Sequence, residues 1–523
     1  MRKFLLIAGI TLALFSCKTT QQSAQNNKQS PTVDPTVYGN TITSSELKDL
    51  LYTYASDKFE GRETGERGQK LAVNFLKQQY ENLDIPSPIA KDDYFQEVPL
   101  TSLKTIKSSI TVNGKAFENY TDFVVMGTIP SQTFDVNNIV YAGYGIDDAN
   151  YSDYKNLDVN GKIVLVKAGE PTNADGTFVI SGTTEKTKWF EGRQASSAKR
   201  DVAQQKGAKA LLLMDDAYFK RVAAYYKKRN ESNYNGKIEL NDKLKNSMAQ
   251  ILISDTLGKA LYAAIKTNDV AKTIPTNIKI NIESEMKAVN SENVVAFIKG
   301  SEKPDEILII SSHLDHIGIT NGQINNGADD DGSGTVALLE IAEAFKKAQL
   351  DGHGPKRSIL FLHVTGEEKG LLGSRYYTDV SPIFPLENTV ADLNIDMIGR
   401  TDPKREGDRN YIYLIGSDKL STELHELSEA ANNTYTHITL DYTYDNDNDP
   451  NRYYYRSDHY NFAKNNIPVI FYFNGTHDDY HQPTDTPDKI QYDLLENRAR
   501  LVFYTAWEIA NRPMRIKVDK LNQ

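Results

Sequence analysis

Residues 306–316 read Glu-Ile-Leu-Ile-Ile-Ser-Ser-His-Leu-Asp-His, so that a continuous apolar run is followed directly by polar side chains. A short run of this kind is typical of a strand that is buried on both faces of a sheet. Similar runs lie at residues 358–362, 389–395 and 467–472, and Val336–Phe345 has the apolar period of a helix. Strands joined by helices predict an α/β fold, a three-layer sandwich with a mostly parallel central sheet.

Polar residues follow the predicted strands at the place where such sheets form their sites, the carboxyl ends. They are His313, Asp315 and His316, the triplet Asp329 to Asp331, the pair Glu367 and Glu368, Asp396, and the loop 476–488. Carboxylates beside a core are costly without a cation, and histidine and carboxylate side chains are zinc ligands. Residues two apart share a face of a strand, so Asp315 is expected to orient the imidazole of His313.

Several of these motifs have plainer interpretations when each is taken alone. The aspartate triplet is compatible with a solvated turn or a calcium loop, but it lacks the spacing of an EF-hand. The run Asp445–Asp449 is expected to be a solvated loop rather than a calcium site. The chain has no Gly-x-Ser-x-Gly segment, which disfavours a serine hydrolase.

The part of the chain before residue 294 contains a separate β-rich region. Residues 139–145, 162–166 and 210–214 are short apolar runs between turn residues, and a helix is expected at 198–206, ended by Gly207. Before this region, helices are expected after the N-cap Thr43 and after Gly68. These short runs, bracketed by turn residues, predict a small module that is inserted into a larger domain. The alternative is that the region continues one large domain.

The N-terminus has the pattern of an export signal. A basic start, Met1 to Lys3, precedes an apolar run that is too short to span a bilayer and ends at Cys17, the single cysteine of the chain. This segment resembles a bacterial lipobox, which implies lipidation of Cys17; a plain signal peptide is the alternative. Residues 18–30 are polar and predict a flexible tether. We therefore expect an exported protein that is held in the bacterial cell envelope by its lipid.

The ordered motifs resemble those of the di-zinc exopeptidases, the family of bacterial leucyl aminopeptidases and glutamate carboxypeptidases. They are His-x-Asp at 313, Asp-Asp-Gly-Ser-Gly at 330, Gly-Glu-Glu-x-Gly-Leu-Leu-Gly-Ser at 366, Asn-x-Asp-Met at 394 and His-x-Pro-x-Asp-Thr at 481. The β-rich region resembles the protease-associated (PA) domain that is often inserted into such enzymes. The expected division is a signal peptide at 1–17, a tether at 18–40, peptidase segments at 41–130 and 286–515, and a PA-like insert at 131–285.

The resemblance implies two Zn²⁺ per chain and a role for each matching residue. Asp330 would bridge the metals, Glu368 and His481 would complete one zinc site, and His313 and Asp396 would complete the other. Glu367 would be the general base, Asp315 would support His313, and the Asp330–Asp331 peptide bond would be cis. The implied reaction is hydrolysis of peptide bonds by a metal-activated water, with aminopeptidase action favoured.

Other residues near these motifs have less defined roles. Tyr480, Arg456 and Asp458 are expected on the substrate side. His477 is the rival of His481, His316 is expected as either an outer partner or a bystander, and His363 is expected to be packed in the core.

The net charge and the complete set of motifs limit which partners and functions are expected. The net charge of -10 argues against a nucleic-acid partner, so peptides are the expected partners and the membrane is touched through the lipid only. The remaining alternatives are a glutaminyl cyclase-like transferase, a glutamate-carboxypeptidase-like hydrolase and a non-catalytic peptide-binding protein. The sequence leaves the oligomeric state open.

Overall fold

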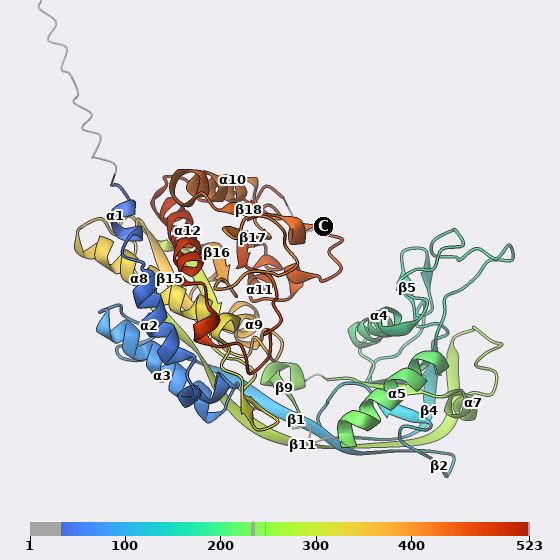
Figure 1. Cartoon of the computed structure of the whole chain (residues 1–523). Coiled ribbons are helices and arrows are strands. Elements are labelled where there is room, and N and C mark those ends of the chain that lie inside the picture. Colours follow the sequence, from blue (N-terminus) through green and yellow to red (C-terminus); the bar gives the residue numbers. More distant parts are fainter. Residues whose placement is uncertain (1–32, 232–235, 246, 521–523) are drawn as a thin grey trace, which may run out of the picture.

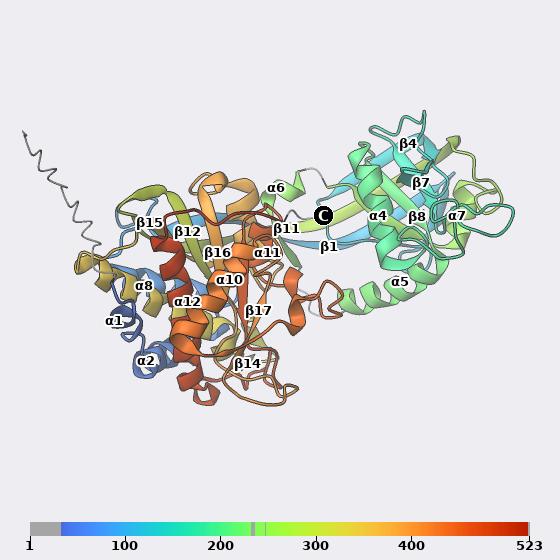
Figure 2. The same cartoon turned by 90° about the horizontal axis from the view of Figure 1, so that it is seen from above.

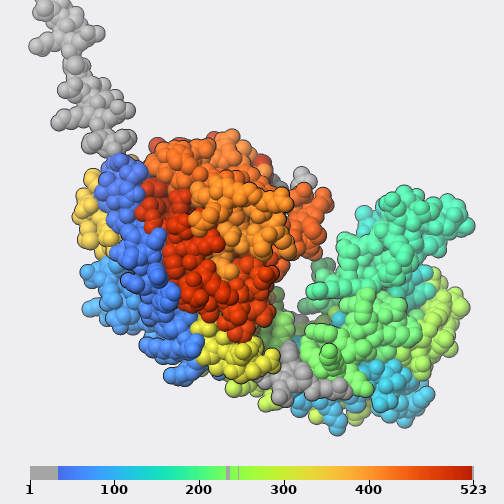
Figure 3. All heavy atoms as spheres, in the orientation of Figure 1, coloured from blue at the N-terminus to red at the C-terminus, as the bar shows by residue number. Residues whose placement is uncertain are grey.

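The computed structural model describes residues 33–231, 236–245 and 247–520. The chain forms two lobes that are joined by a ribbon of two long antiparallel strands, β1 (Phe95–Val112) and β11 (Lys272–Ile298) (Figure 1). The first lobe contains the segments before β1 and after β11, and the second lobe contains most of the segment between them (Figure 2). Residues 237–244 of that segment instead pack on the ribbon beside Leu372 and Arg375 of the first lobe. A hollow separates the two lobes in the space-filling view (Figure 3).

The sheet of the first lobe has the strand order β18-β17-β19-β16-β12-β15-β11. Its central strands run parallel: β12 pairs in this way with β15 and β16, and β16 with β19, whereas β11 and β17 are antiparallel to their inner neighbours. The bounds are β12 (Lys303–His313), β15 (Arg357–Val364), β16 (Thr389–Ile395), β17 (Tyr411–Ile415), β18 (Thr439–Asp441) and β19 (Val469–Phe473). The expected mostly parallel sheet is confirmed.

Both faces of this sheet are covered because alternate side chains of each strand enter different cores. Leu308 and Ile310 of β12 belong to one core, with helices α2, α3, α8 and α12, whereas Ile307 and Ile309 belong to the other, with α11 and the turn Tyr376–Val380. The bounds of the helices are α1 (Thr36–Gly39), α2 (Ser44–Tyr54), α3 (Arg67–Asn82), α8 (Gly334–Leu350), α9 (Leu372–Arg375), α10 (Thr422–Ala431), α11 (His459–Ala463) and α12 (Tyr492–Asn511). The result is the predicted three-layer sandwich.

The second lobe is built on the parallel strands β4, β7, β8 and β10, with β3 antiparallel at the edge. Helices α4 and α5 pack on one face of these strands, and α7 packs on the other together with the distal part of the ribbon. The bounds are β2 (Lys115–Phe117), β3 (Phe123–Val125), β4 (Gln132–Tyr141), β7 (Ile163–Lys167), α4 (Gly192–Gln205), β8 (Ala210–Met214), α5 (Asp216–Glu231), β10 (Ala249–Ile253) and α7 (Asp255–Leu261).

Short elements complete both lobes. They are the hairpins β5 (Asp147–Asp148) with β6 (Tyr151–Ser152) and β13 (Ile319–Thr320) with β14 (Gln323–Ile324), and β9 (Lys237–Leu240), which pairs with β1 and leads into α6 (Asn241–Leu244).

The second lobe begins ahead of residue 131, where the insert was predicted to start. Ile110 and Val112 of β1 and Phe123 of β3 pack in its core. The difference arises because β1 runs without a break from one lobe to the other, so no turn marks the boundary in the sequence. The other predicted domain limits stay predictions. Cys17 and most of the predicted tether lie outside the described residues.

No described helix combines the length and the apolar character that crossing a bilayer requires.

Candidate metal centre and active site

The polar residues singled out in the sequence meet at the carboxyl edge of the first lobe's sheet. His313 is the last residue of β12, Asp396 follows β16 directly, and Glu368 lies on the loop after β15. Asp330 lies in the irregular turn Ala328–Ser333 before α8, and His481 lies on the loop after β19. The peptide bond Asp330–Asp331 is cis, as the resemblance implied.

Two groups of donor atoms share Asp330. The first consists of His313, Asp330 and Asp396. Its His313 Nε2 lies 3.1 Å from Asp330 Oδ1 and 3.5 Å from Asp396 Oδ1. All three residues are buried. The shared aspartate is the arrangement expected for a carboxylate that bridges two cations.

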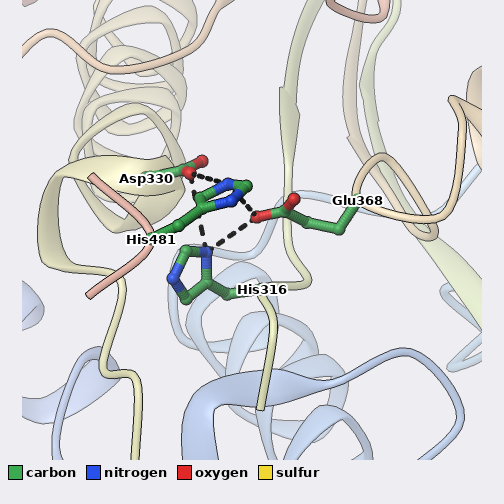
Figure 4. A group of neighbouring side chains, drawn as sticks. All are labelled: His316, Asp330, Glu368 and His481. Carbon is green, nitrogen blue, oxygen red and sulfur yellow. Dashed lines mark ion pairs between the residues drawn. The ribbon is translucent and has the colours of Figure 1, made fainter. Parts of the chain in front are cut away.

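The second group consists of Asp330, Glu368, His481 and His316, whose side chains point toward one another (Figure 4). His481 Nε2 lies 3.0 Å from Asp330 Oδ2 and 3.1 Å from Glu368 Oε1. His316 Nδ1 lies 2.9 Å from the same Glu368 atom and 3.7 Å from Asp330 Oδ2.

The chemistry of these atoms fits a metal better than it fits hydrogen bonding. The buried atoms His313 Nε2, Asp330 Oδ2, Glu368 Oε1 and His481 Nε2 have no hydrogen-bond partner despite their short contacts. Buried polar atoms are rarely left unpaired, and nitrogen and carboxylate oxygen are the donors that zinc takes. Burial would raise the pKa of Asp330, but its contacts with His313, His316 and His481 outweigh burial and hold the pKa well below the usual value.

Glu367 lies beside both groups, and Asp315 holds its backbone. The Asp315 carboxylate accepts a hydrogen bond from the amide of Glu367 at 3.1 Å and from the Thr64 hydroxyl at 2.7 Å. Burial raises the pKa of Glu367, and the charges of Glu368 and Asp396 raise it further. A carboxylate with a raised pKa suits a group that accepts and returns a proton.

The role expected of Asp315 toward His313 needs a correction. Nδ1 of His313 lies 3.0 Å from the backbone carbonyl oxygen of Asp315, not from its carboxylate. The reason is local: β12 ends at His313, so the alternation of side chains along the strand does not extend to Asp315.

Two further residues, Asp485 and Ser457, hold the ligand loops through contacts that the sequence motifs do not predict.

 The carboxylate of Asp485 accepts hydrogen bonds from the amides of Asp329 and Asp330, at 3.0 and 3.2 Å. The Ser457 hydroxyl donates to Asp396 Oδ2 at 2.6 Å and accepts from the side-chain amide of Asn394 at 2.9 Å. Both contacts join residues that are far apart in the chain, so spacing alone does not reveal them.

Two segments of the chain match known protein families. Residues 293–506 match the sequence model of peptidase family M28, and residues 133–261 match that of the PA domain. Residues 293–506 form an M28 peptidase domain. The predicted resemblance to zinc exopeptidases with an inserted PA domain is thereby confirmed.

Individual relatives of the M28 domain are distant. A probable zinc metalloprotease of Pyricularia oryzae is 27% identical over 296 residues, which cover 49% of this chain and 57% of that protein. A probable leucine aminopeptidase 2 of Aspergillus fumigatus is 24% identical over 435 residues, which cover 83% of this chain and 71% of that protein. The chain therefore spans little more than half the length of the first of these relatives.

A solved structure, an aminopeptidase from Aneurinibacillus sp. strain AM-1, aligns with a TM-score of 0.48 and 22% identity, covering 94% of this chain and 99% of that chain.

Three further histidines that the sequence analysis weighed, His477, His363 and His316, are placed differently from one another. His477 Nε2 lies 3.1 Å from Asp329 Oδ2, and His477 is in neither metal group. His363 is buried, with its ring nitrogens 2.8 Å from the Tyr80 hydroxyl and 3.0 Å from the Ser312 hydroxyl. His363 is thus a packed core residue, as expected. His316, whose role the sequence left open, belongs to the second group of candidate ligands.

The three residues expected on the substrate side of the M28 domain are placed differently. Tyr480 stacks on His481 with the ring centroids 3.9 Å apart. Asp458 is buried; one oxygen of its carboxylate accepts a hydrogen bond from the Ser374 hydroxyl at 2.5 Å, and the other oxygen is unpaired. Arg456 is exposed and lies over the ring of Tyr453 at 5.0 Å, and no described contact joins it to the metal groups.

The acidic run Asp445–Asp449 makes ordinary loop contacts. Asp445 accepts from the amide of Gly416 at 2.7 Å, Asp447 pairs with Lys419 at 2.6 Å, and Asp449 accepts from the amide of Tyr453 at 3.0 Å. No candidate metal group among the described residues includes this run. These contacts favour the loop interpretation over a calcium site.

Proposed function

We propose that the chain is an aminopeptidase with two Zn²⁺ ions that removes the N-terminal residue of peptides. The observation that carries this proposal is the convergence of unpaired buried donor atoms in two groups that share Asp330. A relative whose match covers 83% of the chain, the probable leucine aminopeptidase 2 of Aspergillus fumigatus, supports an aminopeptidase rather than a carboxypeptidase.

The residues divide the work of hydrolysis. His313 and Asp396 would hold one metal, and Glu368 and His481 would hold the other. Asp330 would bind both metals. When bound, the metals supply a Lewis acid for water and for the scissile carbonyl. Glu367 would take a proton from the attacking water at its carboxylate and return it to the departing amine. Asp315 and Ser457 hold Glu367 and Asp396 in place through the hydrogen bonds described above.

Replacing the proposed base tests the chemistry. We expect Glu367→Gln to lower kcat by roughly 10²- to 10⁴-fold, the usual effect of losing a general base, and to leave the zinc content unchanged. Glu387→Gln, at an exposed glutamate, is the matched control and should behave as the parent. Full activity of Glu367→Gln with zinc bound would refute the role of this carboxylate.

A substrate panel separates the aminopeptidase from its alternatives. Aminoacyl p-nitroanilides with a free amino group should be cleaved, and their N-acetylated forms should not. Cleavage of blocked peptides from the C-terminus would instead favour a carboxypeptidase, and cyclisation of N-terminal glutamine without hydrolysis would favour a cyclase. If none of these compounds is turned over by the zinc-loaded protein, a non-catalytic peptide-binding protein becomes the better explanation.

We also propose that the remainder of the peptide lies in a polar cleft that begins at Glu368. The cleft measures about 840 Å³ and extends along the ribbon, where Lys104, Glu285 and Lys287 line it. Its mixture of acidic and basic side chains suits a peptide backbone and a charged chain end better than an apolar ligand.

For the N-terminus, which lies outside the described residues, we propose export and lipid attachment at Cys17 in the cell envelope. Incorporation of a labelled fatty acid into the wild-type chain, and not into Cys17→Ser, is the expected result. Equal labelling of the two chains, or no labelling of either, would contradict lipid attachment at this cysteine.

A further inference from the structure

His316 occupies a position in the second donor group for which the family resemblance provides no role. Its side chain is fully buried, and neither ring nitrogen has a hydrogen-bond partner. A buried imidazole with both nitrogens unpaired is costly. Its Nδ1 atom, however, points at the atoms of Asp330, Glu368 and His481 (Figure 4).

The spacing of these four atoms fits one tetrahedral ion. With zinc bonds of about 2.0–2.1 Å, donors at the corners of a tetrahedron lie about 3.3 Å apart. The N···O distances in the group are 2.9, 3.0, 3.1 and 3.7 Å, which scatter around that value.

A role as a mere hydrogen-bond partner of Glu368 fits less well. The 2.9 Å contact between His316 Nδ1 and Glu368 Oε1 does not meet the geometry of a hydrogen bond, since both atoms are left unpaired. Two donors of one ion stand in this relation to each other, because each directs its lone pair at the ion and not at its neighbour.

The surrounding backbone is shaped to the His316 ring. Gly327, with φ at 55°, packs so closely that an added Cβ would lie 2.6 Å from ring atoms Cγ and Cδ2. The amide of His316 donates to the carbonyl of Arg62 at 3.3 Å, which fixes the start of the side chain. The ring is therefore held in one place before any ion arrives.

We propose that His316 is a protein ligand of the second metal, so that this subsite has four protein ligands and the His313 subsite has three. This inference rests on the two-metal centre proposed above. Closed four-ligand sites are typical of structural zinc, whereas catalytic sites keep a position open. The subsite of His313, Asp330 and Asp396 is then the one that keeps room for water, and the His316 subsite holds its ion more tightly.

Zinc binding without any activity measurement tests the proposal. Wild-type protein and His316→Ala are stripped of metal, titrated with Zn²⁺ against a chromophoric chelator, and analysed for zinc content after dialysis. Losing an outer partner costs roughly 10- to 100-fold in affinity, so loss of a direct ligand should weaken one subsite by more than about 100-fold and leave the other unchanged. A weaker effect, or an equal effect on both subsites, overturns the proposal.

A cysteine at the same position gives a spectroscopic test that does not depend on loss of binding. Because Nδ1, the nitrogen nearer the backbone, faces the group, a thiolate with its longer bond to the metal reaches almost as far. His316→Cys in a Cys17→Ser background should show thiolate-to-cobalt absorption in the near ultraviolet when loaded with Co²⁺, and Cys17→Ser alone should not. A folded His316→Cys protein that binds Co²⁺ without this absorption contradicts the assignment.

His425→Ala is the control for losing a histidine outside the metal centre, since His425 is hydrogen-bonded to the Ser417 hydroxyl in another part of the domain. The two proposals fail in different ways. A wild-type protein that holds one zinc or none refutes the two-metal centre, whereas two zinc ions in both wild type and His316→Ala with equal affinity refutes the role of His316 alone.

Discussion

Arg62 is fully buried and links two loops of the metal centre. Its guanidinium donates to the carbonyl of Leu314 at 3.1 Å, of Asn326 at 2.6 Å and of Gly327 at 2.9 Å. The planar guanidinium donates hydrogen bonds to several carbonyls at once. A lysine ammonium, on its flexible side chain, matches this geometry less well. Arg62 thereby joins the turn after β12 to the loop that carries Asp330.

We expect Arg62→Lys to lower the free energy of unfolding of the first lobe by about 1–3 kcal/mol, the cost of leaving a buried carbonyl unpaired. The measurement is urea unfolding in a Trp189→Phe background, followed by the fluorescence of Trp507, which packs in the core of that lobe. Arg67→Lys, at a side chain that is 70% exposed, is the control. Equal stability of the two variants would mean that the Arg62 fork is dispensable.

At the scale of single residues, the sequence predicted which side chains gather but not how each one is held. Asp396 could be found because a carboxylate at the end of an apolar strand needs a cation, whereas Asp330 and Glu368 were selected among neighbouring carboxylates by the family resemblance. The contact expected between the Asp315 carboxylate and His313 was wrong, and the role of His316 was left open, since the placement of both residues depends on where β12 ends. Arg62 and Asp485 act through contacts with residues that are distant in sequence, which no local pattern reports.

At the scale of the elements, strands β1 and β11 of the ribbon line the proposed peptide cleft. Lys104 and Glu285 are neighbours across the two strands, and Lys287 lies two residues further along the same face. Reversing these lysine charges removes attraction for the carboxylate end of a short peptide.

The double substitution Lys104→Glu and Lys287→Glu should lower kcat/KM for tripeptides by about fivefold, since an exposed charge contact contributes up to about 1 kcal/mol. Cleavage of an aminoacyl p-nitroanilide, which has no such carboxylate, should be unaffected. Lys115→Glu on β2, outside the cleft, serves as the control. A parallel loss for both substrate types would argue against peptide binding along the ribbon.

Helix α4 places a charged side chain inside the second lobe. Lys199 is fully buried, and its ammonium donates to the carbonyls of Lys167 and Gly169, both at 2.9 Å. Burial lowers the pKa of Lys199 from 10.5 to about 7, although Asp153 and Asp215 oppose the shift. Between pH 7 and 10.5 the unfolded chain therefore binds a proton that the folded lobe has released.

Stability must rise with pH wherever the unfolded state holds more protons. The contribution of Lys199 to the free energy of unfolding should thus increase by about 2 kcal/mol from pH 7 to pH 9, and Lys199→Met should lack this increase. Urea unfolding in a Trp507→Phe background, followed by the fluorescence of Trp189, which is buried in the second lobe, measures this increase. Lys209→Met, at an exposed lysine, should retain the parent's pH dependence; a Lys199→Met profile parallel to the parent's would disprove the linkage.

The helices and central strands followed from apolar period and turn residues, because each is a local pattern. The length of β1, 18 residues, did not, since it is decided by pairing with β11, a partner more than a hundred residues away.

For the whole molecule, the two lobes have separate hydrophobic cores, and the metal groups belong to the first lobe alone. A ligand that binds only the folded state adds stability, by about 4 kcal/mol at a thousand times its dissociation constant. Removing the metals also leaves several buried carboxylates without a cation.

Chelation should therefore destabilise the first lobe and leave the second unchanged. In thermal unfolding, Trp189→Phe protein, which reports on Trp507, should show a transition that moves to lower temperature with EDTA, and Trp507→Phe protein should show one that does not move. Re-addition of Zn²⁺ should restore the first transition, which separates loss of metal from damage by the chelator. Equal shifts of both transitions would show that the lobes unfold as one unit.

The unbroken ribbon also constrains how the chain folds. Residues 113–271 separate the ends of β1 and β11, so bringing these strands together in an otherwise unfolded chain means closing a long loop, with its entropic cost. Once the second lobe has folded, its core holds the end of β1 beside the start of β11. The two strands can then pair residue by residue from that point toward the peptidase sheet, as the strands of a hairpin do. We therefore expect the inserted lobe to act as an internal folding template for the peptidase lobe that surrounds it in the sequence.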